Sequence, residues 1–522
     1  MINTSNGYNN GNGNGNGNSN INSNSNSCDL IIKNANVVIP KIGVIKTNIL
    51  IENGKIKELT NSSTSVNYSK SINANDKYVL PGLIDPHVHY GVFSPVEVAS
   101  TTESKSAAVG GVTTIMRMLR VYQSYKDEIS KHLEASAKNH FIDYGIHASI
   151  LNFDQVEDIS YLYQSGIHSF KLYMNLGSTD NRILMDMYPY RNLRLPKNAY
   201  VSDELCNSVL SKSSAFKNSV VLVHAEDHNT CANLIEEKKL EKSKLENRTL
   251  DTSTENEKNN PANPSKDNPL DTWSKCRPTK SEVIAIKKIM NMARQFGSNI
   301  YFVHIGSNDA LDAILYERQI GGCNAYIETC PHYLTHPVDF NDIRGKVVPP
   351  LRSKNDIASL WSAIKNGVID TIGTDHVANT LSLKLGENND IWTALAGFPG
   401  VATMLPVLLH YGVNLRHLPI LRLAELTSYN TSKIFGMFPK KGSIQKGSDA
   451  DLVIIDVDLV QKVTPDLLQS SSDYTIYDGI KLQGWPIVTI SRGKIIMENG
   501  VVFPENLGHG EFIGSNNHII KE

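Results

Sequence analysis

Residues 85–89 read Asp-Pro-His-Val-His and follow an apolar run that extends from Tyr78 to Ile84. If this run is a strand, His87 and His89 point to the same face, because strand side chains alternate with a period of two. Neutral imidazole is the commonest metal ligand in proteins, so the pair is a candidate for half of a metal site. Isolated pairs also occur by chance in long sequences, and the metal interpretation therefore depends on partners elsewhere in the chain.

The size, charge and composition of the chain limit the kinds of protein that it can be. Its 522 residues can bury a large core, which is typical of one large domain with a smaller one. A net charge of -2 gives no basic surface for nucleic acid, and no stretch approaches the ~18 continuous apolar residues of a membrane span. Six cysteines without CxxC spacing suit a reducing compartment, and no secretory signal is visible. We therefore expect a soluble, cytoplasmic protein without nucleic-acid or membrane partners.

Segments at both ends of the chain have the composition of strands joined by tight turns. β-Branched runs recur between residues 30 and 51, and the same texture returns between residues 452 and 496. We expect one small β-sandwich domain built from residues 28–80 and 436–504, although two separately docked hairpins also fit the pattern.

Three further segments have polar compositions. Residues 1–27 are almost entirely Asn, Gly and Ser and are predicted to be a disordered tail. Residues 237–275 are dense in Lys, Glu, Asn and Pro and are predicted to be an exposed insertion. Residues 505–522 are predicted to be a loose C-terminal tail.

Between residues 81 and 435, apolar strand-like runs alternate with longer helix-like stretches. This α/β alternation predicts a (β/α)8 TIM-like barrel, whose active site lies where the strands end. Doubly wound sheets use the same alternation, so the count alone does not decide. The eight predicted strands are residues 83–89, 112–119, 144–151, 168–174, 219–224, 299–304, 324–329 and 369–375.

Ionisable side chains occupy the ends of these predicted strands, where a barrel places its catalytic residues. One such histidine would be unremarkable, but six side chains together indicate a catalytic constellation. They are His87, His89, Lys171, His224, His304 and Asp375.

The ordered motifs around these residues resemble the cyclic amidohydrolases of the amidohydrolase superfamily: dihydropyrimidinases, hydantoinases, allantoinases and dihydroorotases. The resemblance extends from about residue 29 to residue 502. Its motifs are Pro-Gly-Leu-Ile-Asp-Pro-His-Val-His at 81–89, Gly-Gly-Val-Thr-Thr at 110–114, Phe-Lys at 170–171, His-Ala-Glu at 224–226, Glu-Thr-Cys-Pro-His-Tyr-Leu at 328–334 and Gly-Thr-Asp-His at 373–376.

The resemblance implies a binuclear centre of divalent metal ions, with zinc the natural choice for these ligands. One ion would be held by His87, His89 and Asp375, and the other by His224 and His304. Lys171 would be N-carboxylated by carbon dioxide and would bridge the two ions. This is chemically sound, because a lysine screened from water has a lowered pKa and offers a neutral amine.

The implied activity is metal-assisted hydrolysis of a cyclic amide, with Asp375 as the residue that accepts and returns the proton. His376 follows Asp375 on a strand and is predicted to face away from it and to pack. Cys330, His332 and Tyr333 follow the seventh strand and are predicted to contact the substrate or to support the ligands. By resemblance, we also expect a homotetramer.

The identity of the ring depends on positions outside the metal ligands. Dihydropyrimidinases and hydantoinases usually have polar substrate contacts at three positions where this chain has Leu176, Val348 and Ala396. Allantoinases share the wording of residues 328–334 and 346–354, so opening of allantoin to allantoate is the first prediction. Ring opening of the dihydropyrimidinase or hydantoinase type is the alternative, and a catalytically inactive scaffold of the same fold is a further one.

At two places the chain differs from the families named above in the charge of its side chains. Dihydroorotases place an arginine just after the His-x-His pair to bind the substrate carboxylate, whereas this chain has Tyr90. After the Gly-Gly-Val-Thr-Thr motif the relatives commonly continue with an acidic or small polar residue and Met-Pro, whereas this chain has Arg117 and Arg120 in this segment. Arg120 lies at a predicted strand end and either binds an anionic group of an unusual substrate or forms a structural salt bridge.

Overall fold

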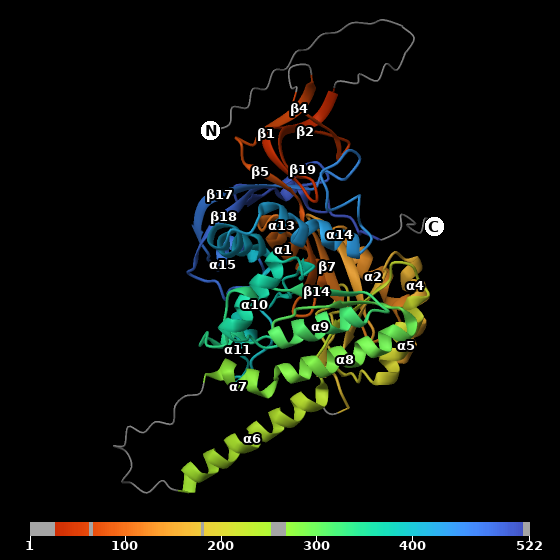
Figure 1. Cartoon of the computed structure of the whole chain (residues 1–522), viewed down its shortest axis with the longest axis vertical. Coiled ribbons are helices and arrows are strands. Elements are labelled where there is room, and N and C mark those ends of the chain that lie inside the picture. The colour runs from red at the N-terminus through yellow and green to blue at the C-terminus, as the bar shows by residue number, and fades with distance from the viewer. Residues whose placement is uncertain (1–26, 62–65, 179–181, 252–267, 515–522) are drawn as a thin grey trace, which may run out of the picture.

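The computed structural model describes residues 27–61, 66–178, 182–251 and 268–514. The predicted tail at residues 1–27 lies outside the described residues except for Ser27. Figure 1 shows a central α/β body with a β-rich region at one end, built from the two ends of the chain, and the long helix α6 at the other.

A parallel sheet forms the centre of the body, and its strand order is β15-β14-β13-β12-β9-β8-β7-β6-β16. The eighth strand is split, because β15 pairs with β14 whereas β16 pairs with β6. The two ends of the sheet therefore meet in one chain segment, and the predicted TIM-like barrel is confirmed. The strands are β6 (Leu83–His89), β7 (Val112–Leu119), β8 (Asp143–Ser149), β9 (Ser169–Tyr173), β12 (Val220–His224), β13 (Asn299–Phe302), β14 (Ala325–Thr329), β15 (Thr371–Ile372) and β16 (His376–Val377).

Helices cover the outside of this barrel. In α8, Ile286 and Met290 lie one turn apart on the buried face, and the helix ends at Gly297, whose φ of 65° is left-handed. Helix α10 begins with a capping box between Ser353 and Asp356. The helices are α1 (Val96–Val109), α2 (Tyr125–Ala137), α3 (Phe153–Glu157), α4 (Ile159–Gln164), α5 (Asp203–Ser214), α7 (Pro269–Cys276), α8 (Thr279–Phe296), α9 (Asn308–Ile320), α10 (Lys354–Lys365), α11 (Leu381–Leu385), α12 (Met404–Val407), α13 (Ile420–Ala424) and α14 (Asn430–Ile434).

The two ends of the chain form one mixed sheet of nine strands, which confirms the predicted shared β domain. Strand β5 lies at its centre, where it pairs in parallel with β1 and in antiparallel with β17. After Gly82, β5 continues directly into barrel strand β6; a Cβ at Gly82 would lie 2.2 Å from Oγ1 of Thr113, so only glycine fits this junction. The strands are β1 (Ser27–Ile39), β2 (Gly43–Glu52), β3 (Lys55–Thr60), β4 (Asn67–Asn73), β5 (Tyr78–Pro81), β17 (Leu452–Lys462), β18 (Lys481–Ser491), β19 (Lys494–Glu498) and β20 (Val501–Val502).

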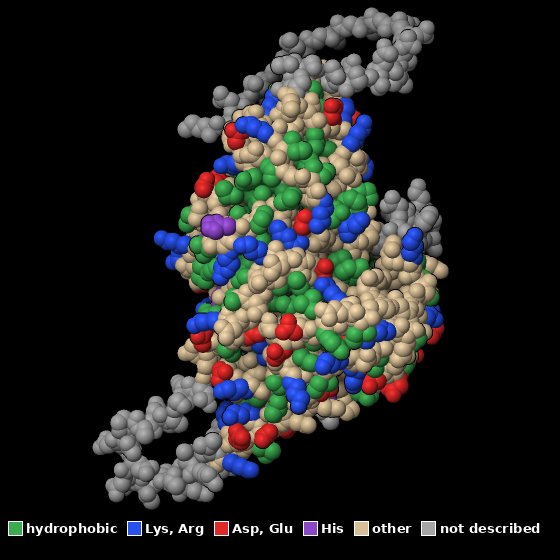
Figure 2. All heavy atoms as spheres, in the orientation of Figure 1, with side chains coloured by type: hydrophobic (Ala, Val, Ile, Leu, Met, Phe, Trp, Pro, Cys, Tyr) green, Lys and Arg blue, Asp and Glu red, His purple; other side chains and the backbone are tan. Residues whose placement is uncertain are grey.

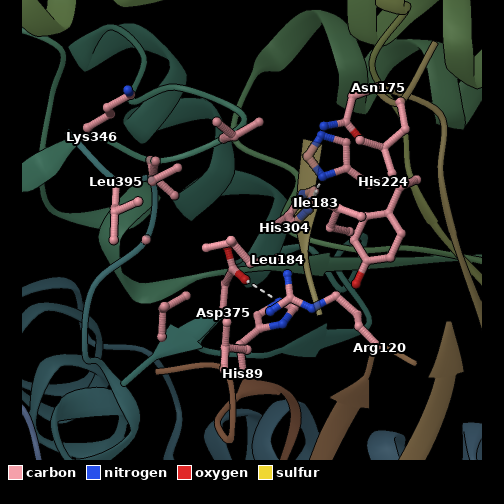
Figure 3. A pocket seen from close by; sticks show the side chains of 18 of the residues that line it. His89, Arg120, Asn175, Ile183, Leu184, His224, His304, Lys346, Asp375 and Leu395 are labelled. Carbon is pink, nitrogen blue, oxygen red and sulfur yellow. Dashed lines mark hydrogen bonds and ion pairs between the residues drawn. The ribbon is translucent and has the colours of Figure 1, made fainter. Parts of the chain in front are cut away.

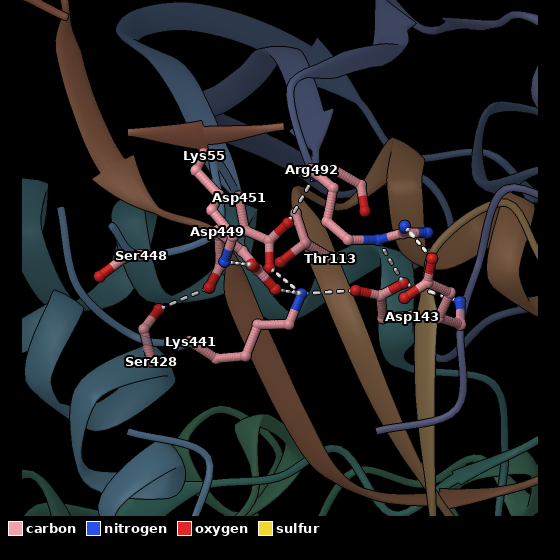
Figure 4. A network of polar contacts seen from close by, with 12 residues as sticks. Lys55, Thr113, Asp143, Ser428, Lys441, Ser448, Asp449, Asp451 and Arg492 are labelled. Carbon is pink, nitrogen blue, oxygen red and sulfur yellow. Dashed lines mark hydrogen bonds and ion pairs between the residues drawn. The ribbon is translucent and has the colours of Figure 1, made fainter. Parts of the chain in front are cut away.

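A buried ion cluster joins this sheet to the bottom of the barrel (Figure 4). Nζ of Lys441 lies 2.5 Å from carboxylate oxygens of Asp143 and Asp451 and 3.0 Å from Asp449. Asp143 begins β8, at the end of the barrel opposite the strand ends that carry the histidines, and it also pairs with Arg492. The three carboxylates thus surround a lysine ammonium, and we assign them a structural role.

Two peripheral segments are more regular than their compositions indicate. Residues 252–267 of the predicted insertion lie outside the described residues. Part of the predicted insertion at 237–275 belongs to the 24-residue helix α6 (His228–Asp251), which projects from the body (Figure 1). The C-terminal segment is not loose up to residue 514. Its backbone bonds to β8 through the amides and carbonyls of Tyr144, Glu511 and Ile513, because Phe512 forms a parallel bridge with Tyr144.

The surface carries both signs of charge. On the face drawn in Figure 2, Lys and Arg side chains are interspersed with Asp and Glu. Of the helices in the described residues, none has the length and apolar character needed to cross a bilayer.

Candidate metal centre

Three of the predicted ligands meet at the closing point of the barrel. Nε2 of His87 lies 3.2 Å from Nε2 of His89, and these two nitrogens lie 3.3 and 3.2 Å from Oδ1 of Asp375. Donor atoms about 3.3 Å apart are expected around one tetrahedral ion with bonds of roughly 2.0–2.1 Å. The three atoms therefore form a near-equilateral triangle with the spacing of ligands to a single ion.

The remaining nitrogen of His87 is fixed by a carboxylate. Nδ1 of His87 lies 2.8 Å from Oε1 of Glu328, at the end of β14. Glu328 also accepts hydrogen bonds from the backbone N–H of His304 and from the hydroxyl of Tyr301. Such a carboxylate holds the imidazole in the orientation and tautomer that leave Nε2 available to a metal.

The second predicted pair shows the same arrangement. Nδ1 of His224 and Nε2 of His304 face each other at 3.0 Å. Nε2 of His224 lies 2.6 Å from Glu226, and the guanidinium of Arg277 donates to both oxygens of Glu226 at 3.0 and 2.6 Å. The inward nitrogens are therefore the ones left for an ion, as for the first pair.

Burial keeps these imidazoles in their ligand form. The pKa values of His87, His89 and His304 are lowered well below the ordinary range, mainly because burial disfavours the charged ring. Neutral rings with inward lone pairs are what a divalent ion requires.

Lys171 is the sixth predicted residue, and it is fully buried on β9. Its Nζ has no hydrogen-bond partner among the described residues. Burial lowers the pKa of Lys171 to about 7, so a large fraction of the amine is neutral near pH 7. An unpartnered, partly neutral amine that lines the same cavity as the two histidine pairs fits a modified lysine better than a structural ammonium.

The backbone turns two of these ligands into the barrel mouth. His304 has a φ of 44° and Asp375 a φ of 50°, both in the left-handed region. The segment before Asp375 is fixed by Asp85, which accepts a hydrogen bond from the backbone N–H of Thr374 at 3.0 Å. Such conformations are enriched at functional sites, where the surrounding structure holds them.

All six side chains line one cavity of about 350 Å³ at the ends of the strands (Figure 3). Its walls are apolar at the three positions where polar contacts were expected from the resemblance, since Leu176, Val348 and Ala396 all line it. Trp273 of α7 closes another side.

The remaining predicted substrate contacts differ in whether they reach the cavity. Arg120 lines the cavity, whereas His332 and Tyr333 do not belong to its lining. The hydroxyl of Tyr333 donates to the carbonyl of Pro349 at 2.6 Å, and the ring of His332 packs edge-on against Phe398. A substrate contact for these two residues stays a prediction.

His376 faces away from the cavity, as expected from the strand period. Its Nε2 lies 2.9 Å from Glu103 of α1, and its Nδ1 accepts from the backbone N–H of Gly400 at 3.0 Å. Sequence reasoning missed the supporting groups Glu226, Glu328 and Arg277. Glu226 and Glu328 lie inside the motifs at 224–226 and 328–334, so the sequence does mark them, whereas no local pattern marks Arg277.

The donor set described above fits two divalent ions and gives a binuclear, metal-dependent hydrolase site at the mouth of a TIM-like barrel. Residues 78–496 match the model of the amidohydrolase family, and the chain belongs to this family.

Relatives and solved structures agree with this assignment along nearly the whole chain. An L-hydantoinase of Paenarthrobacter aurescens is 28% identical over 504 residues, which cover 94% of this chain and 99% of that protein. A dihydroorotase of Methanosphaera stadtmanae is 27% identical and covers 91% of this chain and 98% of its own length. The structure of an L-hydantoinase (dihydropyrimidinase) from Arthrobacter aurescens matches with a TM-score of 0.79 at 27% identity, over 93% of this chain and 100% of that one. Membership in the cyclic amidohydrolase group is confirmed, and the enzyme acts on carbon–nitrogen bonds.

Proposed function

We propose that this enzyme opens a cyclic ureide ring of the hydantoin or dihydropyrimidine type by hydrolysing one ring amide. The observation that carries the proposal is the triangle of donor atoms from His87, His89 and Asp375, which faces Lys171 and the inward nitrogens of a second histidine pair in one cavity. The relatives named above support the substrate class.

One ion would be held by His87, His89 and Asp375 and the other by His224 and His304, and an N-carboxylated Lys171 would supply further oxygen ligands. Zinc fits the imidazole and carboxylate donors. When bound, such ions polarise a ring carbonyl and lower the pKa of water.

The protein's own groups complete the reaction. The apolar walls around Leu176 and Val348 hold the flat ring and exclude bulk water. The carboxylate of Asp375 takes a proton from the attacking water and returns it to the ring nitrogen as the carbon–nitrogen bond breaks. Glu328 and Glu226 keep His87 and His224 in place through the bonds given above.

Allantoin stays a prediction. Its support is the wording of residues 328–334 and 346–354, while the relatives reported above are named for hydantoin and dihydroorotate chemistry. The apolar Leu176, Val348 and Ala396 indicate that the ring is held differently from a typical hydantoin.

The test is a ring-opening panel of hydantoin, dihydrouracil, allantoin and dihydroorotate, run on purified enzyme with its metal content measured. We expect about two zinc equivalents per chain and turnover of at least one ring. Lys171→Ala should lose both metal and activity, whereas Lys239→Ala, an exposed lysine of α6, should keep both. A metal-free protein that gains nothing from zinc and bicarbonate would instead be an inactive scaffold. A fully active Lys171→Ala variant would overturn the binuclear assignment.

A further inference from the structure

Arg120 is a charged residue in the cavity that the reaction above does not use. It directly follows β7 and lines the same cavity as His89, Lys171 and Asp375. Figure 3 shows its side chain extending into the cavity on the side of His89 and Asp375. Only 14% of the side chain is exposed, so the charge of this cavity-lining arginine is held largely out of water.

The charge of Arg120 is not matched by a hydrogen-bonded carboxylate. Its nearest acid is Asp186, whose Oδ1 lies 3.6 Å from Nε, beyond hydrogen-bond distance. Nε of Arg120 is a buried donor without a partner among the described residues. The other oxygen of Asp186 already accepts a hydrogen bond from Nη2 of the fully buried Arg117 at 2.6 Å. Two guanidinium groups thus face the carboxylate of Asp186, and only Arg117 forms a hydrogen bond to it.

The rest of the lining does not neutralise this charge either. Asp375 is the only acidic side chain among the cavity-lining residues of the described chain, and it is committed to the metal triangle. Arg277 is neutralised by Glu226, while Lys346, another lining cation, donates to the backbone carbonyl of Ala394 at 2.6 Å. A neutral ring would therefore leave Nε of Arg120 without a hydrogen-bond partner and leave its charge only the distant oxygen of Asp186, which is unfavourable in a largely buried site.

We infer that the ring substrate carries a carboxylate, and that Arg120 binds it with a charge-assisted, two-point hydrogen bond. This inference rests on the proposed function and narrows its substrate class to carboxylated cyclic ureides. The anion replaces the polar contacts that Leu176, Val348 and Ala396 cannot make, and it fixes which ring amide faces the metal ligands.

Two other roles for Arg120 make different predictions. If Arg120 only forms a structural salt bridge to Asp186, Arg120→Gln should lower thermal stability and should reduce kcat/KM for all substrates equally. If Arg120 instead bonds to a carboxylated Lys171, Arg120→Gln should reduce the amount of metal that the enzyme retains.

The experiment compares matched ring pairs on the metal-loaded enzyme: hydantoin with hydantoin-5-acetate, and dihydrouracil with dihydroorotate. We expect wild-type kcat/KM to favour the carboxylated member of at least one pair by tenfold or more. Arg120→Gln should lower that preference by about 30- to 1,000-fold, and Arg120→Lys should lower it less, because the charge remains without the fork. Arg194→Gln is the matched control. Arg194 stacks at 5.1 Å on the ring of Phe93 but does not line the cavity, so the preference should change less than threefold.

Equilibrium binding of orotate and uracil, with metal content and melting temperature, separates the outcomes. Tighter binding of orotate that depends on Arg120, without ring opening, would retain the anion site and reject the proposed function. Ring opening with equal loss on both members of each pair in Arg120→Gln would reject the anion site and retain the function. Loss of metal in Arg120→Gln would overturn the inference in favour of the bond to Lys171. A lower melting temperature with an unchanged preference would overturn it in favour of the salt bridge.

Discussion

Replacing Lys441 by methionine should strongly destabilise the protein without touching its active site. The ammonium is 1% exposed and contacts three carboxylates, those of Asp143, Asp449 and Asp451, which are at most 4% exposed. The three carboxylates face Lys441, Arg492 and the half-exposed Lys55, and Lys441 is the only one of these cations that contacts all three. Methionine preserves most of the volume, so the expected loss is electrostatic.

The expected loss of stability follows from the carboxylates that stay buried when Lys441 is removed. Removing one partner of a buried ion pair costs about 3–5 kcal/mol, because the remaining charge stays buried without compensation. At roughly 2.1 cal/mol/K per residue, the unfolding entropy of a chain of this length is about 1 kcal/mol/K, so the melting temperature should fall by about 3–5 °C.

The chain offers a matched control in Lys55, whose Nζ lies 3.3 Å from the same Asp449 but whose side chain is 54% exposed. An exposed pair contributes about 0–1 kcal/mol, so Lys55→Met should shift the melting temperature by about 1 °C or less. Thermal unfolding of both variants and the wild type, followed by circular dichroism at one scan rate, measures the difference. Equal shifts for Lys441→Met and Lys55→Met would refute the reasoning.

The loss in Lys441→Met should also depend on pH. Burial alone would raise the pKa of Asp143, but Lys441 and Arg492 outweigh it and hold that pKa below its ordinary value. Without Lys441, the buried carboxylates titrate above the ~3.9 of an unfolded aspartate. The folded variant then binds more protons than the unfolded chain, so its stability falls as pH rises. The gap from wild type should be larger at pH 8 than at pH 5.5, and a gap that shrinks with rising pH would contradict this account.

Three further outcomes are expected. Glu226→Gln should weaken metal retention by about 10- to 100-fold in chelator competition, because His224 loses its orienting carboxylate; a change below threefold would count against that role. Ending the chain at Gly508 should lower the melting temperature, since the strand-like pairing with Tyr144 is lost, whereas ending it at Gly514 should not. Removing the metals with a chelator should lower the melting temperature, and zinc should restore it; identical melting curves would mean that the site does not hold metal tightly.

The barrel and its six strand-end residues could be predicted from the sequence because their signals are local. Buried parallel strands are nearly continuous apolar runs, and the polar residue that ends each run marks the active-site edge. The period of two places His87 and His89 on one face and turns His376 away from Asp375. These inferences need only a few neighbouring residues each.

The supporting contacts could not be predicted in the same way. Glu328 lies 241 residues from the His87 that it orients, and Arg277 lies 51 residues from Glu226. Docking of residues 511–513 relies in part on backbone hydrogen bonds to β8, which leave no compositional trace, and on a pair between Glu511 and the distant Arg492. Helix α6 carries a local signal in the sequence, because Glu and Lys recur at a spacing of three, and Lys238 lies 3.0 Å from Glu241.

The interrupted eighth strand explains how neighbouring residues serve opposite sides of the barrel wall. A regular strand at Asp375 would fix its side chain by the pleat alone. The left-handed φ of 50° breaks the strand between β15 and β16 and lets Oδ1 reach both His87 and His89, while His376 resumes the pleat and bonds to Glu103. Aspartate tolerates this conformation better than most residues, so the position favours a short carboxylate that can both complete the donor triangle and exchange a proton with the substrate. Glutamate there would keep the charge but move the carboxylate by one methylene. The geometry of the break thus accounts for an aspartate as the one acidic ligand of the centre.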